Sequence, residues 1–241
     1  MIVYSSRSPE TQGTFPISSV LHERAPTGTA QIRVPHHWPR YKLIPVLGLI
    51  AALGLSAWPF RAPLLRSVAD AWIVSDRSGP ADAVAVFGGG IADRPFAAAE
   101  YYRAGLVNKV LVSNVRLGPA EQLGVVKPDG VANREVLLKL GVSAGDIEFF
   151  GDGLTSTHDE AVALHEWVER TGAHSIIVPT EIFAARRLRW MLKRVFGEGF
   201  TVKVPAIESP EYQRADWWQS EKALLAFQNE VIKYIYYRLK Y

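Results

Sequence analysis

The stretch Ala83-Val84-Ala85-Val86-Phe87-Gly88-Gly89-Gly90 decides the fold of this chain. Its run of apolar residues is typical of a strand that is buried on both faces, as in a parallel sheet. The glycines end the strand, and Asp93, Arg94 and Pro95 lead into a predicted helix over residues 96–104. The turn can present backbone N–H groups to an anion beside the start of this helix. A tight turn with positive φ would explain the same glycines, so both interpretations stay open.

Strand and helix patterns alternate along the rest of the chain. Further strands are predicted over residues 109–113, 147–150, 175–178 and 201–204, and further helices over residues 131–140, 157–171, 183–196 and 217–239, with a loop over residues 118–130. This alternation predicts an α/β domain in three layers, with a mostly parallel five-stranded sheet covered by helices on both faces. In such sheets a ligand binds outside the carboxyl ends of the strands.

Composition excludes several classes of protein. The chain has 241 residues, of which 48% are hydrophobic, and this is too apolar for a disordered chain and too polar for a multi-span transporter. The net charge of +3 is small and no dense basic stripe follows, so no nucleic-acid partner is expected. The absence of cysteine excludes disulfides, thiol catalysis and thiolate metal sites.

The N-terminal third of the chain predicts a tail and a membrane anchor. Residues 1–42 are polar and without periodicity, and we expect a flexible tail. Residues 43–60, from Leu43 to Phe60, hold eighteen positions without a charge. As a helix they would span roughly 27 Å, about the thickness of a bilayer's hydrocarbon core. Aromatic residues typical of membrane interfaces flank this segment: Trp38, Tyr41 and Trp58.

Two other interpretations of residues 43–60 are a buried helix of a soluble protein and the core of a signal peptide. The long leader and the absence of a clear small-x-small cleavage site disfavour the signal peptide. We therefore expect one transmembrane helix that contacts the lipid bilayer. Residues 61–81 are then a juxtamembrane linker, in which residues 63–71 are amphipathic, and the folded domain covers residues 82–241.

Charges around the predicted span give a weak orientation signal. Basic residues on the N-terminal side are Arg24, Arg33, Arg40 and Lys42, and those on the C-terminal side are Arg61, Arg66 and Arg77. The positive-inside rule favours a cytoplasmic N-terminus and a periplasmic main domain at the inner membrane, by a margin of one charge.

Polar residues gather at the predicted strand ends. They are Gly88, Gly89, Gly90 and Arg94 after the first strand, Ser113, Asn114 and Arg116 after the second, residues 152–160 after the third, and Thr180, Glu181, Arg186 and Arg187 after the fourth. Arginines that face a Gly-rich turn and a helix N-terminus suit a phosphate or a carboxylate. Structural explanations also exist, because Thr157 with Glu160 forms a capping-box pattern and Asp159 suits a helix start. Their shared place at one sheet edge favours a ligand site.

Common catalytic motifs do not occur in the sequence. It contains no P-loop, no H-E-x-x-H and no G-x-S-x-G, and its glycines lack the G-x-G-x-x-G spacing. Among six histidines only His158 stands at a strand end, where it could act as acid, base or ligand. No metal site is predicted, and the sequence does not identify a cofactor.

An ordered set of motifs extends over residues 82–239. It consists of Gly88-Gly89-Gly90 with Arg94, residues 99–105, residues 110–113, Arg134-Glu135 before Gly141-Val142, residues 156–161, residues 178–187, and Trp217-Trp218 with Asn229-Glu230 and Lys233-Tyr234. This set resembles the bacterial domain-of-unknown-function family typified by YdcF, SanA and ElyC. The resemblance implies a Rossmann-like domain whose pocket uses the Gly-rich loop, an arginine, a Ser/Thr-rich turn and an acidic residue. It also implies a link to the cell envelope, to peptidoglycan or lipid-carrier metabolism or to exopolysaccharide production, and one member is reported to bind S-adenosylmethionine.

Three positions depart from the family pattern. Asn114 stands where many members have glycine, Glu181 where they have serine, and Ala184 where they have histidine. If that histidine transfers protons in relatives, this chain lacks the function, because a methyl group carries no labile proton. Arg187 keeps the family arginine.

The first hypothesis is a membrane-anchored envelope protein that acts on a phosphorylated or anionic glycan or lipid intermediate. Arg94 and Arg187 would hold the anion, and the N–H groups of Gly89 and Gly90 would stabilise it. Three carboxylates are candidates for the base: Glu135, Asp159 and Glu160. The remaining expected ligand-binding residues are Gly88, Ser113, Thr157 and Thr180.

A second hypothesis is a catalytically degenerate scaffold, an accessory subunit that meets a membrane protein through its N-terminal or C-terminal helix. The C-terminal helix carries a wide apolar face, formed by Leu224, Phe227, Val231, Tyr234 and Ile235. Core packing would explain that face equally well. A third hypothesis is binding of a nucleotide-like cofactor such as S-adenosylmethionine.

Overall fold

The computed structural model describes residues 43–241, and the predicted flexible tail, residues 1–42, lies outside them. The chain divides into two compact units within its first helix, at Ala51. Helix α1 (Leu43–Ala57) leads through the 3-10 turn η2 (Trp58–Phe60) into α2 (Arg61–Trp72). Within the described residues, one helix is long and apolar enough to cross a membrane, and its most apolar window has 0% of its residues buried. A helix in the core of a soluble protein would instead be mostly buried.

Helix α2 packs on the folded domain. Leu65, Ala69 and Trp72 join an apolar cluster with Phe183 and Trp217. The indole nitrogen of Trp72 donates a hydrogen bond of 2.9 Å to the carbonyl oxygen of Phe183. Packing against the domain thus begins before residue 82, where the sequence predicts the domain to start.

The central sheet has five parallel strands in the order β3-β2-β1-β4-β6. They are β1 (Ala83–Val86), β2 (Lys109–Val115), β3 (Ile147–Leu154), β4 (Ser175–Ile177) and β6 (Thr201–Lys203). In the central strand, Val84 pairs with Val110 of β2 on one side and with Ile177 of β4 on the other. The predicted parallel five-stranded sheet is confirmed, and its order is consistent with a Rossmann-like fold.

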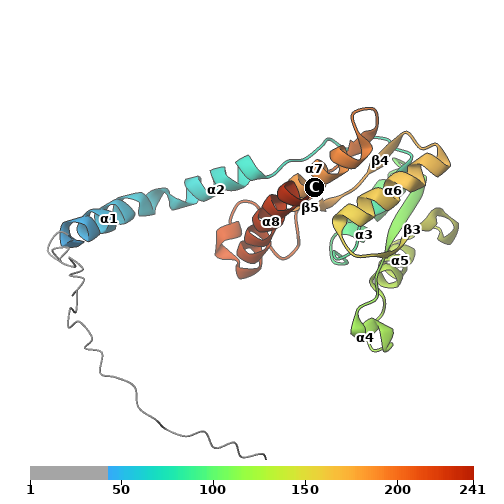
Figure 1. The fold of residues 1–241 in the computed structure, drawn as a ribbon, viewed down its shortest axis with the longest axis horizontal. Helices are drawn as coiled ribbons and strands as arrows, with labels where there is room; N and C mark the ends of the chain where they lie inside the picture. The colour runs from blue at the N-terminus through green and yellow to red at the C-terminus, as the bar shows by residue number, and fades with distance from the viewer. Residues whose placement is uncertain (1–42) are drawn as a thin grey trace, which may run out of the picture. The chain divides into compact units, whose positions relative to one another are not determined.

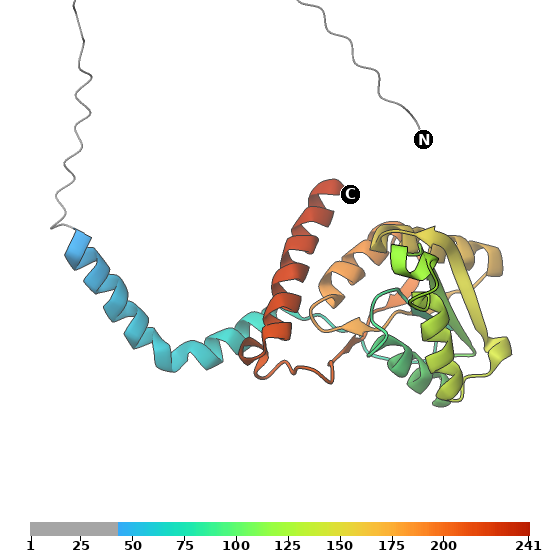
Figure 2. The ribbon, with the colours of Figure 1, turned by 90° about the horizontal axis from the view of Figure 1, so that it is seen from below.

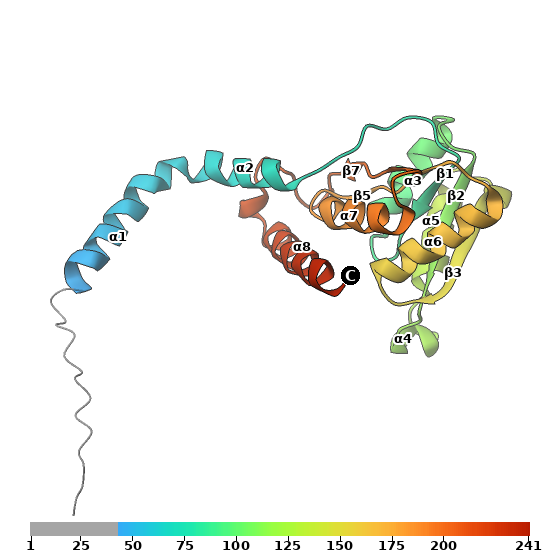
Figure 3. The same cartoon turned by 45° about the horizontal axis from the view of Figure 1, so that its top comes forward.

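Helices cover both faces of this sheet (Figures 1 and 3). Side chains of β1 alternate, because successive residues of a strand point to opposite faces. Ala83 and Ala85 pack toward α6 (Thr157–Thr171) and α7 (Ala185–Phe196). Val84 and Val86 pack toward the helices on the opposite face, which are α3 (Arg94–Arg103) and α5 (Asp129–Lys139). The predicted three layers are therefore present.

The C-terminal helix α8 (Glu221–Lys240) follows the 3-10 turn η4 (Trp217–Gln219). It lies alongside α7, as the view from below shows (Figure 2). The buried side chain of Tyr237 joins the core cluster on the α6 and α7 side of the sheet.

Several boundaries differ from the predicted ones. Strand β3 runs on to Leu154, through Gly151 and Gly153 at positive φ of 68° and 59°, whereas the sequence pattern predicted its end at Phe150. The predicted loop 118–130 contains the short helix α4 (Pro119–Gln122), which projects from the body in Figure 1, and the start of α5. A second sheet of two strands, β5 (Thr180–Glu181) and β7 (Ala206–Ile207), extends beyond β4. The remaining 3-10 turn is η3 (Ala144–Asp146).

The buried core gives a direct test of this architecture. Leu164 of α6 is 0% exposed between the helix and the sheet. We expect Leu164→Ala to lower the free energy of unfolding by roughly 2–5 kcal/mol, because transfer energy is lost and a cavity remains. Leu123, which is 80% exposed, supplies the control Leu123→Ala, with an expected change within about 0.5 kcal/mol. Denaturant unfolding of the full chain in mild detergent, followed by tryptophan fluorescence, would measure both, and equal stabilities would contradict the assigned layers.

Candidate functional site

The strand order places a topological switch point between β1 and β4. Ligands of open α/β sheets bind outside the carboxyl ends of the strands at such a point. Two cavities open there, of about 620 Å³ and about 520 Å³. The larger is the switch-point cavity, lined by residues that include Gly88, Asp93, Arg94, Glu181, Arg187 and Glu230. The smaller is the α6 cavity, lined by residues that include Gly88, Arg116, Thr157, Glu160, Arg187 and Lys233.

The Gly-rich turn after β1 binds carboxylates of the same chain. The N–H of Gly88 donates a hydrogen bond of 2.7 Å to Glu160, and the N–H of Gly89 makes a longer one of 3.4 Å to Asp129. Gly89 has a φ of 74°, and a Cβ on Gly88 would lie 2.5 Å from Cγ1 of Val115. The tight-turn interpretation holds, because the turn needs glycine. The N–H groups of Gly88 and Gly89 face carboxyl groups that the protein itself supplies, and binding of a ligand anion there stays a prediction.

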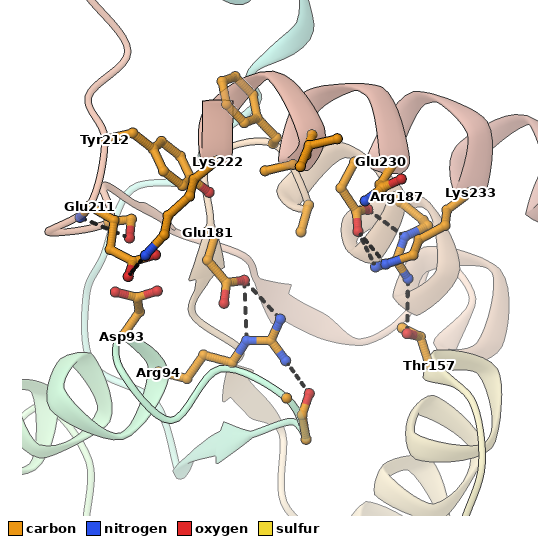
Figure 4. A pocket seen from close by; sticks show the side chains of 18 residues that line it. Asp93, Arg94, Thr157, Glu181, Arg187, Glu211, Tyr212, Lys222, Glu230 and Lys233 are labelled. Carbon is orange, nitrogen blue, oxygen red and sulfur yellow. Dashed lines mark hydrogen bonds and ion pairs between the residues drawn. The ribbon is translucent and has the colours of Figure 1, made fainter. Parts of the chain in front are cut away.

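Arg94 is held by a carboxylate and by the end of β1. Its guanidinium donates hydrogen bonds of 2.7 and 3.2 Å to Glu181, and one of 2.6 Å to the carbonyl oxygen of Gly88. Burial acts to raise the pKa of Glu181, but the charge and hydrogen bonds of Arg94 outweigh it and lower that pKa. Figure 4 shows the two side chains facing each other across the turn. Arg94 therefore has an internal counter-ion rather than a free guanidinium.

Arg187 forms a second, more deeply buried pair. Its guanidinium donates to both carboxylate oxygens of Glu230, at 2.6 and 3.1 Å, and to the hydroxyl of Thr157 at 2.9 Å. The side chains of Arg187 and Glu230 are 8% and 10% exposed. Burial acts to raise the pKa of Glu230, but the hydrogen bonds and charge of Arg187 lower it. Lys233 adds a bond of 3.1 Å to the same carboxylate, so this group connects α6, α7 and α8 (Figure 4).

The wall of the switch-point cavity opposite Arg187 is acidic. Burial, together with the nearby charge of Glu181, raises the pKa of Asp93, and one of its oxygens is buried without a partner among the described residues. Burial and the same carboxylate raise the pKa of Tyr212 to about 12. Glu211 pairs with Lys222 at the cavity edge. Across this cavity as a whole, four cationic side chains stand against four carboxylates.

Glu160 is the predicted base that the structure places at the site. It is 6% exposed and lines the α6 cavity, and burial raises the pKa of its carboxyl. The hydroxyl of Ser113 is buried beside Glu160 and acts to lower its pKa, against the larger effect of burial. The predicted capping box of Thr157 and Glu160 is wrong. Ser156 is the N-cap and accepts a bond from the N–H of Asp159. The side chain of Glu160 instead turns inward and accepts from the N–H of Gly88.

The other predicted bases lie elsewhere. Asp159 accepts hydrogen bonds from the hydroxyl and N–H of Thr155, and these lower its pKa. Glu135 bonds to Lys127 on the exposed side of α5 and lines neither cavity. The carboxylates therefore do not form one cluster, and Glu160 is the one beside the Gly-rich turn.

The remaining predicted residues are near the strand ends in different roles. Thr180 is 1% exposed, and its hydroxyl donates to Glu181 at 2.9 Å. A Cβ on Gly90 would lie 2.6 Å from Nε of Arg94, so this position holds the arginine closely. His158 stacks on Tyr241 with ring centroids 4.2 Å apart. Ala184, at the family histidine position, lines the switch-point cavity.

The sequence did not indicate several of the site residues as ligand-binding candidates. They are Asp93, Asp129, Glu211, Tyr212, Lys222, Glu230 and Lys233. Most come from the segment between β7 and the middle of α8, which follows no strand of the main sheet. The family motif at residues 229–234 was the one available signal for part of it.

Over residues 43–241, no group of three or more His, Cys, Asp or Glu side chains has an arrangement that could hold a metal ion. No protein-family model matches the sequence, and no curated protein matches it. The resemblance to the YdcF-like family therefore remains a prediction.

The Arg187–Glu230 pair makes a quantitative prediction. Glu230→Gln leaves a buried guanidinium without its counter-ion, and we expect the free energy of unfolding to fall by roughly 3–5 kcal/mol. The control Glu211→Gln breaks the exposed pair with Lys222 and should cost roughly 0–1 kcal/mol. Denaturant unfolding of both variants tests this, and a Glu230→Gln variant as stable as the control would show that the pair is dispensable.

Glu160 makes a prediction about pH. Because its folded-state pKa is raised above the ordinary 4.5, the folded chain keeps this proton to higher pH than the unfolded chain does. Its contribution to stability is complete below the unfolded pKa and is lost as the pH rises through the folded value. As the pH rises above 4.5, we expect the melting temperature of Glu160→Gln to fall less than that of the wild type. Melting temperatures recorded across pH would measure this difference.

The control for this titration is Glu135→Gln. The hydrogen bond from Lys127 lowers the pKa of Glu135, so its effect has the opposite sign and appears as the pH falls. Parallel curves for the wild type and Glu160→Gln above a pH of 4.5 would contradict the raised pKa.

Proposed function

We propose that this chain is a membrane-anchored protein of the bacterial cell envelope that binds a phosphorylated or otherwise anionic glycan or lipid intermediate in its α6 cavity. The charge balance of that cavity is the observation that carries the proposal. Arg116, Arg187 and Lys233 line it together with Glu160. Glu230, outside this lining, pairs with Arg187 and Lys233, so two carboxyl groups stand against three cations. Among the described residues, Arg116 has no ion-pair partner. A cavity with surplus positive charge attracts an anion.

The start of α6 adds to this preference. The helix has 15 residues, and its N-terminal end carries partial positive charge and N–H groups that no carbonyl of the helix accepts. Thr155, Ser156 and Thr157 line the cavity at this end. The hydroxyls of Ser156 and Thr157 act as acceptors within the chain, so each keeps its O–H to donate to a ligand. The site thus combines a helix N-terminus, hydroxyls and guanidinium groups, which are the usual partners of a phosphate.

Glu160 is the candidate acid or base for a reaction in this cavity. Its carboxyl with a raised pKa can accept a proton from a hydroxyl or water and return it, as general acid–base catalysis requires. The Gly88 N–H holds one carboxylate oxygen at 2.7 Å and fixes the orientation of the group. Ala184 provides no proton-transfer group, so the proposed chemistry depends on Glu160 rather than on the family histidine position.

The proposed location is supported by the apolar helix and the charges around it. Residues 43–60 would span the inner membrane, with the N-terminus in the cytoplasm and the α/β domain in the periplasm. The excess of one basic residue before the span supports this orientation.

A second candidate function is an accessory subunit without turnover. The switch-point cavity favours it, because Arg94 and Arg187 are each neutralised by a carboxylate of the same chain. Such internal pairing stabilises the fold without any ligand. Anion binding in the α6 cavity separates the two candidates.

The test uses inorganic phosphate and pyrophosphate as probes with the full chain in mild detergent. We expect saturable binding by calorimetry, and we expect Arg116→Ala to weaken it by roughly 1.5–3 kcal/mol, because a charged hydrogen bond is lost. Arg170→Ala removes an exposed arginine that pairs with Glu148 outside both cavities, and its binding should match the wild type. Absence of binding to either probe, or equal loss in both variants, would favour the accessory subunit.

A further inference from the structure

Helix α8 has two opposite faces. Ala223, Glu230 and Tyr237 are buried against the domain. Ile232, Ile235 and Leu239, which we call the α8 outer stripe, are 56%, 53% and 84% exposed. These residues are spaced by three and four positions, so they lie on one side of the C-terminal half of the helix. Exposed apolar side chains gathered on one side of a helix are a candidate interaction surface.

The structure divides the apolar face that the sequence assigned to this helix. Phe227 and Tyr234 pack on the domain, each with its ring centroid 5.6 Å from Trp72. Leu224 and Ile235 are exposed. Core packing therefore explains one part of that face and leaves the α8 outer stripe without a partner among the described residues.

Basic and aromatic side chains border the stripe. Arg238 lies over the rings of Trp190 and Tyr234, at 5.3 and 5.9 Å. Lys240 lies over Tyr236 and Tyr241, at 5.5 and 4.9 Å. Neither cation has a carboxylate partner within residues 43–241. An apolar stripe with Tyr, Trp and unpaired basic residues at its edge has the composition of a helix that lies in a membrane interface.

The chain also keeps this surface within reach of a bilayer. The 12 residues of α2 follow the candidate span and end at Trp72, which contacts α8. Twelve helical residues cover about 18 Å, which is shorter than the thickness of a bilayer.

We infer that the α8 outer stripe docks the domain on an anionic bilayer surface. The apolar side chains enter the boundary between headgroups and acyl chains, and Arg238 and Lys240 contact anionic headgroups. A second copy of the chain is the competing occupant, because the stripe spacing also suits a helix pair. The charges favour lipid: a second copy would bring the same unpaired cations, whereas anionic headgroups neutralise them.

Docking has a consequence for the site, and this part rests on the proposed function. The same helix lines the cavities through Asn229, Lys233 and Tyr236. With α8 on the bilayer, a phosphorylated headgroup at the membrane surface can reach the α6 cavity without leaving the lipid. The inference thus narrows the proposed ligand to an anionic group carried by a lipid.

The test uses the full chain in lipid nanodiscs. The chain has no cysteine, so Ile232→Cys creates a single attachment point for an environment-sensitive fluorophore. We expect nitroxide-labelled lipids to quench this probe in discs that contain phosphatidylglycerol, and to quench it less in pure phosphatidylcholine. A probe at Leu123→Cys, which is also exposed but far from α8 in sequence, should remain unquenched.

Charge reversal tests the role of the basic rim. Each basic residue near an anionic surface contributes about a fivefold preference. The double variant Arg238→Glu, Lys240→Glu should therefore shift the equilibrium away from the docked state by about 25-fold or more. Both positions are exposed, and unchanged melting temperatures would show that the fold is retained.

A probe at Leu49→Cys, within the candidate span, separates this inference from the proposed anchor. Quenching at Leu49 without quenching at Ile232 overturns the docking of α8 and leaves the anchor intact. Quenching at Ile232 alone supports docking and overturns the anchor. Oxidative cross-linking between copies at Ile232→Cys, with no lipid quenching, identifies a second copy as the occupant and overturns the inference.

Discussion

The guanidinium of Arg187 is the buried charge on which the arrangement of the helices depends. It comes from α7 and donates to Glu230 of α8 and to Thr157 of α6. A buried cation without a counter-ion costs several kcal/mol, so α8 must dock where Glu230 reaches Arg187. The last helix of the chain is thereby tied to the strand-end site, which explains why it lines both cavities.

The same requirement shapes the rest of the site. Arg94 is neutralised by Glu181, and the N–H groups of the Gly-rich turn are met by Glu160 and Asp129. An anion that enters the switch-point cavity must therefore compete with carboxylates that are already in place. The α6 cavity differs because Arg116 brings a cation without an opposing charge. In the proposed function, internal pairing would therefore favour the α6 cavity over the switch-point cavity for an anionic ligand.

The secondary-structure elements that depend on local sequence patterns were predicted from the sequence. The apolar run before Gly88 predicted the central strand, and residues 157–171 predicted α6 with the bounds that the structure shows. The capping partner was misassigned because Ser156 and Thr157 both fit the pattern, and only the tertiary position of the Gly-rich turn draws Glu160 inward. The sequence predicted the fold class, but it did not predict the strand order or the position of the switch point.

The ion pairs could not be predicted in the same way. Glu230 lies 43 residues from Arg187 along the chain, and no spacing rule connects positions on two different helices. The sequence placed Glu181 among the polar residues at the strand ends, but its pairing with Arg94 depends on the position of β5 outside the main sheet. Ion pairs between residues distant in the sequence are determined by the packed fold, and the periodicity of the sequence does not reveal them.

Helix α8 shows how one element can serve two environments. A helix of a soluble domain usually has one apolar face, and the opposite face is polar. Here the inner face is fixed by Glu230 and Tyr237, and its polar anchor specifies the docking position. The outer stripe is not part of the core, so it can make a different contact without loss of core packing. Because the two faces share a rigid helix of 20 residues, a contact on the outer stripe also fixes the walls of the cavities that the inner side lines.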